Sequence, residues 1–297
     1  QEALAQACCQ VVPSSSIRKL PAKLMDPKLV SLTAVLGRGI LLFVIMSTAK
    51  DSCQALPAGG PLQSLNHPES FSALVHVPKG ASASPMPLLL YLHGSGQSGD
   101  DLLKTLGPPA TGGPPTELHH GRAVKELAED FVMVAPQTNS GWQAERLSRF
   151  LDFLLGEGQE MLAVELDPAR IYVTGHSIGG TAAMRAAAEI RSPSGKSRFA
   201  AVVPVAPSYM NAYDELKDVP VWLYHGANDI IAPVAASDHA AEVLRALNPE
   251  ADMLRYTRFE QAPTAPGRNP ETHAGHASPI LTYNNSELYR WLLTHTS

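Results

Sequence analysis

The residues with the clearest chemical potential form the pentapeptide Gly175-His176-Ser177-Ile178-Gly179. It follows an apolar, β-prone run (171–174) and precedes an alanine-rich stretch (180–190) that is typical of a helix. A serine between two glycines, on a turn from strand to helix, is the arrangement that exposes a hydroxyl as a nucleophile. Glycines suit a turn this tight, and the start of the following helix favours the anion that forms on attack. We therefore predict that Ser177 is a catalytic nucleophile, against the alternative of a chance glycine-rich pentapeptide.

An acidic residue follows another predicted strand. The apolar run 219–224 ends in His225-Gly226-Ala227-Asn228-Asp229. An aspartate at the carboxyl end of a strand can accept the Nδ1 proton of a histidine and hold the imidazole in one tautomer. We predict this role for Asp229, the alternative being that it only caps the following turn. Asp214 and Asp238 are weaker candidates, because neither directly follows a strong strand.

A histidine that completes the set is expected downstream, in the long loop between the last predicted strand and the last predicted helix. This loop contains His273-Ala274-Gly275-His276. We predict that His276 is the general base and keep His273 as its competitor, whereas His295 is too close to the C-terminus. The two histidines with Glu271 resemble a metal site, but a short cluster without a further ligand pattern is weak evidence. No metal is expected.

Glycine-rich turns beside the nucleophile predict an oxyanion hole and a substrate pocket. The apolar run 87–93 ends in Gly94-Ser95-Gly96-Gln97, where backbone N–H groups can face a cavity. We predict that the N–H groups of Ser95 and Ile178 form the oxyanion hole; an ordinary glycine turn is the alternative. The residues expected to line the substrate pocket are Gly94, Gly96, Trp142 and His176; for Trp142, at a helix start, simple packing is the alternative.

Strands and helices that could position these groups alternate along the chain. Strands are predicted at 71–77, 87–93, 131–135, 170–174, 200–205, 219–224 and 253–259. Helices are predicted at 123–130, 145–162, 180–190, 235–247 and 286–294. This alternation indicates an α/β fold with a mostly parallel central sheet flanked by helices on both faces. The reactive groups of such sheets gather at the carboxyl ends of the strands.

Composition narrows the class of protein. A chain of 297 residues is long enough for one large α/β domain or two small ones, and 17% charged residues with a net charge of −5 fit a folded globular protein. No basic block or aromatic-interleaved basic stripe is present, so no nucleic-acid partner is expected. The sequence also lacks the glycine-rich phosphate loops of nucleotide-binding proteins. Its cysteines are Cys8, Cys9 and Cys53, which leaves the rest of the chain without a disulfide or a thiolate metal site.

The N-terminal region is expected to be separate from the catalytic domain. Residues 29–49 are mostly apolar, with Lys28 and Arg38 ahead of the apolar core 40–46 and Ser47-Thr48-Ala49 after it. This pattern is typical of a signal peptide and predicts a secreted or extracellular protein. The alternatives are a membrane anchor, in which Arg38 would cost about 2.5–3.5 kcal/mol, or a buried element of the domain.

Domain boundaries follow from this reading. We assign residues 1–60 to an N-terminal extension and residues 61–297 to the catalytic domain. Met25 is a plausible start, which would place residues 1–24 upstream of the natural protein. Pro57, Gly59, Gly60 and Pro61 make the stretch 52–68 a predicted linker. Membrane contact is expected only through the N-terminal segment, where it remains uncleaved.

The order of the three candidate residues is nucleophile, acid and base along the chain, which is the order of the α/β-hydrolase fold. The sequence further resembles the phospholipase/carboxylesterase and polyhydroxybutyrate-depolymerase-like esterases over roughly residues 70–295. Four segments carry the resemblance: 92–102 with Gly107-Pro108-Pro109, 134–137, 167–177 and 283–293. Where this family often has an aromatic residue shortly after the catalytic Gly-His, the chain has Ala277-Ser278-Pro279.

This resemblance implies a serine ester hydrolase that uses no cofactor. It implies that the nucleophile is Ser177, the acid Asp229, the base His276 and the oxyanion donors Ser95 and Ile178. The expected partner is a small-molecule ester of lipid, aromatic or polyester type. The alternatives are a serine peptidase or thioesterase with the same triad, or a catalytically dead binding protein of this fold.

Overall fold

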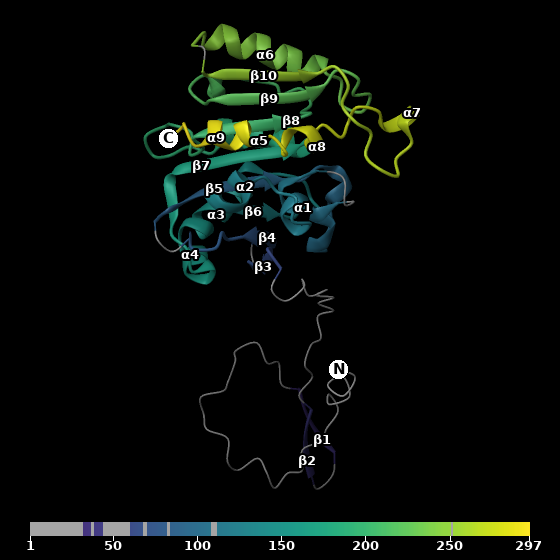
Figure 1. The fold of residues 1–297 in the computed structure, drawn as a ribbon. Helices are drawn as coiled ribbons and strands as arrows, with labels where there is room; N and C mark the ends of the chain where they lie inside the picture. Colours follow the sequence, from purple (N-terminus) through teal and green to yellow (C-terminus); the bar gives the residue numbers. More distant parts are fainter. Residues whose placement is uncertain are drawn as a thin grey trace. The chain divides into compact units, whose positions relative to one another are not determined.

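The computed structural model divides the chain into two compact units, Gln1–Ser52 and Cys53–Ser297. The residues that the structure describes are 32–36, 39–43, 60–67, 70–81, 84–107, 112–250 and 252–297. Figure 1 shows the elements of both units.

In the first unit, part of the apolar stretch 29–49 forms two strands. β1 (Leu32–Leu36) and β2 (Gly39–Phe43) pair antiparallel, with Leu36 opposite Gly39. The other residues of the predicted signal peptide or anchor, together with residues 1–24 and the three cysteines, lie outside the described residues. Within the described ranges, no helix has the length and apolar character that crossing a membrane requires. Export and anchoring both stay predictions.

The second unit is built on a sheet whose described strands follow the order β10-β9-β8-β7-β5-β6-β4-β3 (Figure 1). The strands are β3 (Gln63–Leu65), β4 (Ala73–His76), β5 (Met86–Leu92), β6 (Val132–Pro136), β7 (Leu166–His176), β8 (Ala201–Val205), β9 (Val221–Gly226) and β10 (Leu254–Phe259). In this order, each pair of neighbours from β10 to β6 is parallel. β4 pairs antiparallel with β6, and β3 pairs antiparallel with β4 at the edge of the sheet. The carboxyl ends of β5, β7 and β9 therefore lie at the same edge of the sheet.

Both faces of the sheet are buried, as the continuous apolar runs predict. In β5, Leu88, Leu90 and Leu92 pack into one core, while Leu89 and Tyr91 pack into the other. Successive side chains of a strand point to opposite faces, so each apolar strand supplies both cores at once.

Helices cover each of these cores. The helices that pack on the first face are α3 (Ala144–Leu155), α4 (Glu157–Leu162), α5 (Ile178–Glu189) and α6 (Ala235–Leu247). The helices that pack on the second face are α1 (Pro114–His119), α2 (Lys125–Asp130) and α9 (Ser286–Leu292). The prediction of a mostly parallel sheet with helices on both faces is confirmed.

One predicted helix is two helices in the structure. The stretch 145–162 has helical periodicity throughout, yet Gly156 interrupts it between α3 and α4. Its backbone angles (φ −107°, ψ −114°) lie outside the helical region, where glycine is tolerated better than other residues.

The sequence did not predict the short strands and helices that lie where glycine and proline are frequent. The predicted linker 52–68 contains β3, which pairs with β4 over only three residues. The last long loop contains α7 (Pro270–His273) and α8 (Pro279–Thr282). Elements of three or four residues are too short to show a hydrophobic period, so the sequence carries no pattern for them.

Candidate active site

Ser177 lies at the sharp turn between β7, which ends at His176, and α5, which begins at Ile178. Its backbone has φ 58° and ψ −123°, a conformation that non-glycine residues rarely adopt. Such strained residues cost about 1–3 kcal/mol each and cluster at functional sites. The surrounding contacts must therefore hold this turn in place.

Glycines allow the turn because the backbone of three segments meets there. A Cβ atom on Gly179 would lie 2.0 Å from the carbonyl oxygen of Leu92, at the end of β5. A Cβ on Gly175 would lie 2.3 Å from the carbonyl oxygen of Gly179, and one on Gly180 would lie 2.8 Å from that of Val205. All three distances are shorter than real Cβ contacts, so backbone atoms fill the space that side chains would need.

Asp229 and His276 are hydrogen-bonded to each other. Nδ1 of His276 donates to Oδ2 of Asp229 over 2.7 Å. The other carboxylate oxygen, Oδ1, accepts from the backbone N–H groups of Ile231 and Ala232, each at 2.9 Å. Burial alone would raise the pKa of Asp229, but hydrogen bonds from His225 and His276 outweigh it and hold that pKa below its ordinary range. The carboxylate is thus ionised behind the imidazole.

A second histidine, His225, lies against the same carboxylate. Its Nε2 is 3.5 Å from Oδ2 of Asp229 and 2.8 Å from the carbonyl oxygen of Ala232. Because a carbonyl only accepts, we assign the proton to Nε2, and Nδ1 then accepts from the hydroxyl of Ser237 at 2.7 Å. Sequence reasoning missed His225, although it stands four residues before the predicted acid in the same motif.

The loop that carries His276 is tied to the loop that carries Asp229. Gly275 has φ +75°, and a Cβ there would lie 2.4 Å from the carbonyl oxygen of Asn228. The side chain of Asn228 makes two hydrogen bonds to the backbone of Ala262, at 2.8 and 3.0 Å. Close packing and paired amide hydrogen bonds thus fix two segments that are far apart in sequence.

His176 also holds the position of His276. Its Nε2 donates to the carbonyl oxygen of His276 over 2.9 Å, and the two imidazole rings lie 4.6 Å apart between centroids. Burial, with the neighbouring His276 adding to it, lowers the pKa of His176 to about 3. A neutral His176 therefore separates the nucleophile turn from the loop of the base.

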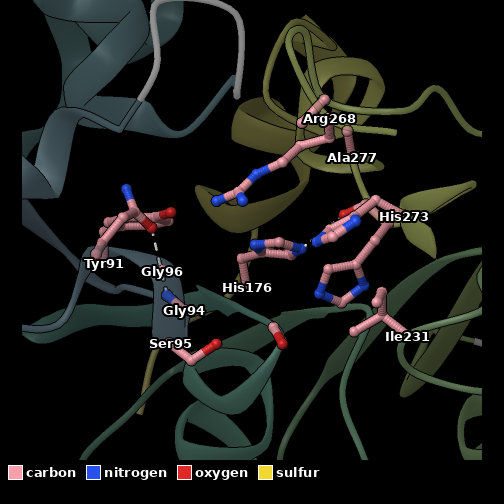
Figure 2. Close-up of a pocket in the computed structure, with 13 residues that line it drawn as sticks. Tyr91, Gly94, Ser95, Gly96, His176, Ile231, Arg268, His273 and Ala277 are labelled. Carbon is pink, nitrogen blue, oxygen red and sulfur yellow. Dashed lines mark hydrogen bonds between the residues drawn. The ribbon is translucent and has the colours of Figure 1, made fainter. Parts of the chain in front are cut away.

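A cavity of about 340 Å³ opens at this point (Figure 2). Its lining includes most of the residues that the sequence predicts for the site: Gly94, Ser95, Gly96, His176, Ser177 and His276. Asp229 lies behind His276, with only 6% of its surface exposed. Sequence reasoning had no signal for Tyr91, Gln97, Ile231, Ala265, Arg268 and Ala277, which also line the cavity.

The two predicted oxyanion donors lie at the ends of neighbouring strands. Ser95 begins a short 3-10 helix after β5, and Ile178 begins α5 after β7. In the part of the chain that the structure describes, no hydrogen bond uses the backbone N–H of either residue. Both groups therefore remain available to a ligand, although Ile178 is not among the lining residues.

Trp142 does not line this cavity, contrary to the expectation from its sequence position. Its indole Nε1 donates to the carbonyl oxygen of His93 over 3.1 Å, and its ring lies 4.7 Å from that of His93. It also packs against Phe71. Trp142 thus supports the turn after β5 from behind, because its hydrogen bond directs the ring to that side.

Over the described ranges, the competing candidates for the acid and the base do not form the hydrogen bond between a carboxylate and a histidine that those roles require. Asp238, on α6, accepts a hydrogen bond from the hydroxyl of Tyr256, and Asp214 lies in a short 3-10 helix. His273 lines the cavity, but its Nδ1 is bonded to the hydroxyl of Thr272 and not to a carboxylate. Among the described residues, no group of three or more His, Cys, Asp or Glu side chains is arranged to hold a metal ion.

Part of the chain matches a known protein family and is similar to curated proteins. Residues 139–264 match the family model described as Phospholipase/Carboxylesterase. The chain is similar to Cutinase est1 of Thermobifida alba, with 28% identity over 111 residues, which is 36% of each chain. It is also similar to Cutinase 2 of Thermobifida cellulosilytica, with 27% identity over 109 residues, covering 35% of this chain and 39% of that protein. The chain thus matches little more than a third of the length of these curated relatives.

Two solved structures share the fold. A thermostable esterase superposes with a TM-score of 0.57 and 24% identity, covering 80% of this chain and 63% of that chain. A putative dienelactone hydrolase from Klebsiella pneumoniae superposes with a TM-score of 0.51 and 16% identity, covering 78% of this chain and 98% of that chain. The predicted α/β-hydrolase fold and the resemblance to its phospholipase/carboxylesterase members are confirmed.

The contacts of the nucleophile turn generate a stability prediction. Gly179→Ala places a Cβ 2.0 Å from the carbonyl oxygen of Leu92 and 2.6 Å from that of His93. Overpacking against backbone is expected to lower the free energy of unfolding by about 3 kcal/mol or more, as measured by urea denaturation. Gly96→Ala is the matched control, because a Cβ there meets nothing within 4 Å. Equal stability of the two variants would contradict the proposed packing.

The low pKa of His176 predicts a pH dependence of stability. The folded protein holds this pKa near 3, against an ordinary value of 6.5. Between these values the unfolded chain binds more protons, so the stabilisation is complete above pH 6.5. It is lost as the pH falls toward 3, by up to about 1.4 kcal/mol per pH unit. His176→Gln removes this titration, so its free energy of unfolding should fall less steeply from pH 6.5 to 4 in urea denaturation.

Because other groups titrate in the same range, the test compares how steeply the free energy of unfolding falls with pH in the native protein and in His176→Gln. Burial also lowers the pKa of His93, but His93 is present in both proteins, so its contribution cancels in the difference between the two slopes. Two parallel curves would show that His176 carries no such shift.

Proposed function

We propose that this α/β-hydrolase is a serine carboxylic-ester hydrolase that acts through Ser177, His276 and Asp229 and an acyl-enzyme intermediate. The observation that carries the proposal is that Ser177, on its strained turn, lines the same cavity as His276, whose Nδ1 is bonded to Asp229. The match to the phospholipase/carboxylesterase family model and the similarity to cutinases support ester hydrolysis as the reaction.

The first step transfers the acyl group to the protein. With its Nδ1 proton donated to Asp229, a neutral His276 has a free lone pair on Nε2. Nε2 takes the hydroxyl proton of Ser177, and the serine oxygen forms a bond to the ester carbonyl carbon. The ionised carboxylate of Asp229 stabilises the imidazolium that results. The imidazolium then protonates the leaving alcohol as the carbon–oxygen bond of the ester breaks.

The second step releases the acid. Water donates a proton to Nε2 of His276 and attacks the acyl-enzyme carbonyl, and the same proton returns to Ser177 as the acid leaves. In both steps negative charge develops on the carbonyl oxygen. The unused N–H groups of Ser95 and Ile178 would stabilise this charge, reinforced by the N-terminal end of α5.

The size of the cavity favours small to medium esters. A volume of about 340 Å³ is at the lower end of the range for small-molecule pockets. Exposed apolar side chains follow the carboxyl ends of β7 and β9, namely Ile178, Ile230 and Ile231. Because the matched relatives are cutinases, polyester-type substrates belong in the test set with lipid and aromatic esters. A panel of p-nitrophenyl esters of increasing chain length, with methyl ferulate and a polyester film, ranks these classes.

Export of the protein is a further part of the proposal. It is supported by the apolar residues 40–46, which follow Lys28 and Arg38 and precede the small residues Ser47 and Ala49.

Replacement of the nucleophile tests the function. Ser177→Ala should lower kcat for p-nitrophenyl butyrate by about 10⁴-fold or more, because the nucleophile and base act as a unit. Ser98→Ala is the matched control, as Ser98 lies outside the cavity lining and should keep full activity. A fluorophosphonate probe should label the native protein and Ser98→Ala but not Ser177→Ala. A native protein that neither hydrolyses esters nor reacts with the probe would favour a binding protein of this fold.

Substitution at Ser95 tests the oxyanion hole, because the proposed donor is a backbone N–H. Ser95→Pro removes that N–H together with the hydroxyl. Proline suits the position, because Ser95 is the first residue of its 3-10 helix and Gly94 before it is extended (φ −79°, ψ 174°). We expect kcat to fall about 10²- to 10³-fold. Ser95→Ala keeps the N–H and should retain activity. If alanine costs as much as proline, the donor is the side chain or another group.

A further inference from the structure

One charged side chain lines the cavity without an assigned role. Arg268 comes from the long loop after β10, and Figure 2 shows its guanidinium group extending into the cavity, toward Tyr91 and His176. No aspartate or glutamate is among the described residues that line this cavity. Arg268 is exposed and lines the proposed substrate site, and no acidic residue of the described lining pairs with it across the cavity.

The backbone around Arg268 is fixed on both sides. The N–H of Arg268 donates to the carbonyl oxygen of Ala265 over 3.0 Å, closing a turn with Pro266 second and Gly267 third, at φ +78°. Proline and glycine at these positions are typical of a type II turn. Directly after it, the side chain of Asn269 accepts from the N–H of Glu271 over 2.9 Å and caps α7. The loop thus presents the arginine in a defined place.

The guanidinium itself has no partner in the described ranges. No hydrogen bond or ion pair there uses it, although Glu271 lies three residues away on the same loop. The nearest acid of the site, Asp229, is committed to His276 and to two backbone N–H groups. The histidine beside the catalytic pair, His176, has a pKa lowered to about 3 by burial and is neutral. The positive charge of Arg268 is thus not compensated within the cavity.

We propose that Arg268 binds a carboxylate of the substrate, so that the cavity selects esters that carry a free carboxylate a few carbon atoms from the scissile bond. A single guanidinium matches one carboxylate through two parallel N–H···O bonds. Ile231, Ala265 and Ala277 give apolar contacts for the carbon chain between the two groups. The inference rests on the proposed esterase function.

Matched substrates separate the charge from the chain length. Monoethyl succinate, glutarate and adipate place the carboxylate on the acyl side, and ethyl butanoate, pentanoate and hexanoate are their neutral counterparts. 4-Acetoxybutanoate and butyl acetate form the corresponding pair for the alcohol side. Hydrolysis of each ester is followed by titration of the acid released, and kcat/KM is compared between the native protein, Arg268→Met and Arg268→Lys.

Arg268→Met should lower kcat/KM about tenfold or more for one of the two carboxylate series, as expected for loss of a charge-assisted hydrogen bond. It should leave the neutral esters within about twofold, a change of no more than about 0.4 kcal/mol. Arg268→Lys should recover part of the loss. Arg149→Met, which removes an exposed charge on α3 outside the cavity, should change neither class. Equal effects of Arg268→Met on charged and neutral esters, or no effect on either, would overturn the inference.

A binding measurement decides the role of Arg268 without turnover. In the Ser177→Ala background, calorimetry compares charged and neutral ligands that resist hydrolysis. The N-ethyl monoamide of adipic acid is paired with N-ethylhexanamide for the acyl side, and 4-acetamidobutanoate is paired with N-butylacetamide for the alcohol side. In one of the two pairs the charged amide should bind more tightly than its neutral counterpart, and Arg268→Met should abolish the difference. If the native protein hydrolyses no ester but this difference is present, the proposed function fails and the carboxylate site stands. If esters are hydrolysed and the difference is absent, the carboxylate site fails alone.

Discussion

The site depends on the contact of backbone with backbone where β7 turns into α5. The carbonyl oxygen of Leu92 occupies the place that a side chain at Gly179 would need, so the end of β5 and the start of α5 are in direct contact. This contact holds Ser177 at a positive φ and brings the two turns that carry Ser95 and Ile178 together. The strain at one residue is offset by packing around it, which is the usual condition for such strain to persist.

The base lies on irregular structure, yet three contacts restrain it. Gly275 packs against the backbone of Asn228, His176 donates to the carbonyl oxygen of His276, and Asp229 accepts from its ring. Asn228 and Asp229 belong to the turn after β9, and His176 is the last residue of β7, so two separate segments restrain the residue. A loop position is thus as well defined as a position on a helix, which general base catalysis requires because the proton must be within hydrogen-bond reach.

The sequence predicted those parts of the protein that have a period or a motif. Both cores and the position of Ser177 follow from apolar runs and from paired glycines around a strand-to-helix turn. For Trp142 the sequence left pocket lining and simple packing open, and packing is what the structure shows, because the direction of the side chain depends on a hydrogen bond to His93. Arg268 was missed because its place results from a four-residue turn within a long loop, and no pattern in the sequence states where such a turn points.

The distribution of charge in the cavity follows from which groups are buried and which are partnered. Burial raises the pKa of Tyr91 and lowers that of His176, so both are neutral at ordinary pH. The buried carboxylate of Asp229, behind His276, keeps its charge because histidines and backbone N–H groups surround it. The described lining then presents Arg268 as its permanent charge to an entering ligand. A ligand with a carboxylate at one end and an apolar chain would pair with the charge of Arg268 and contact the apolar lining. Such pairing gives a selectivity between esters that an entirely apolar cavity would lack.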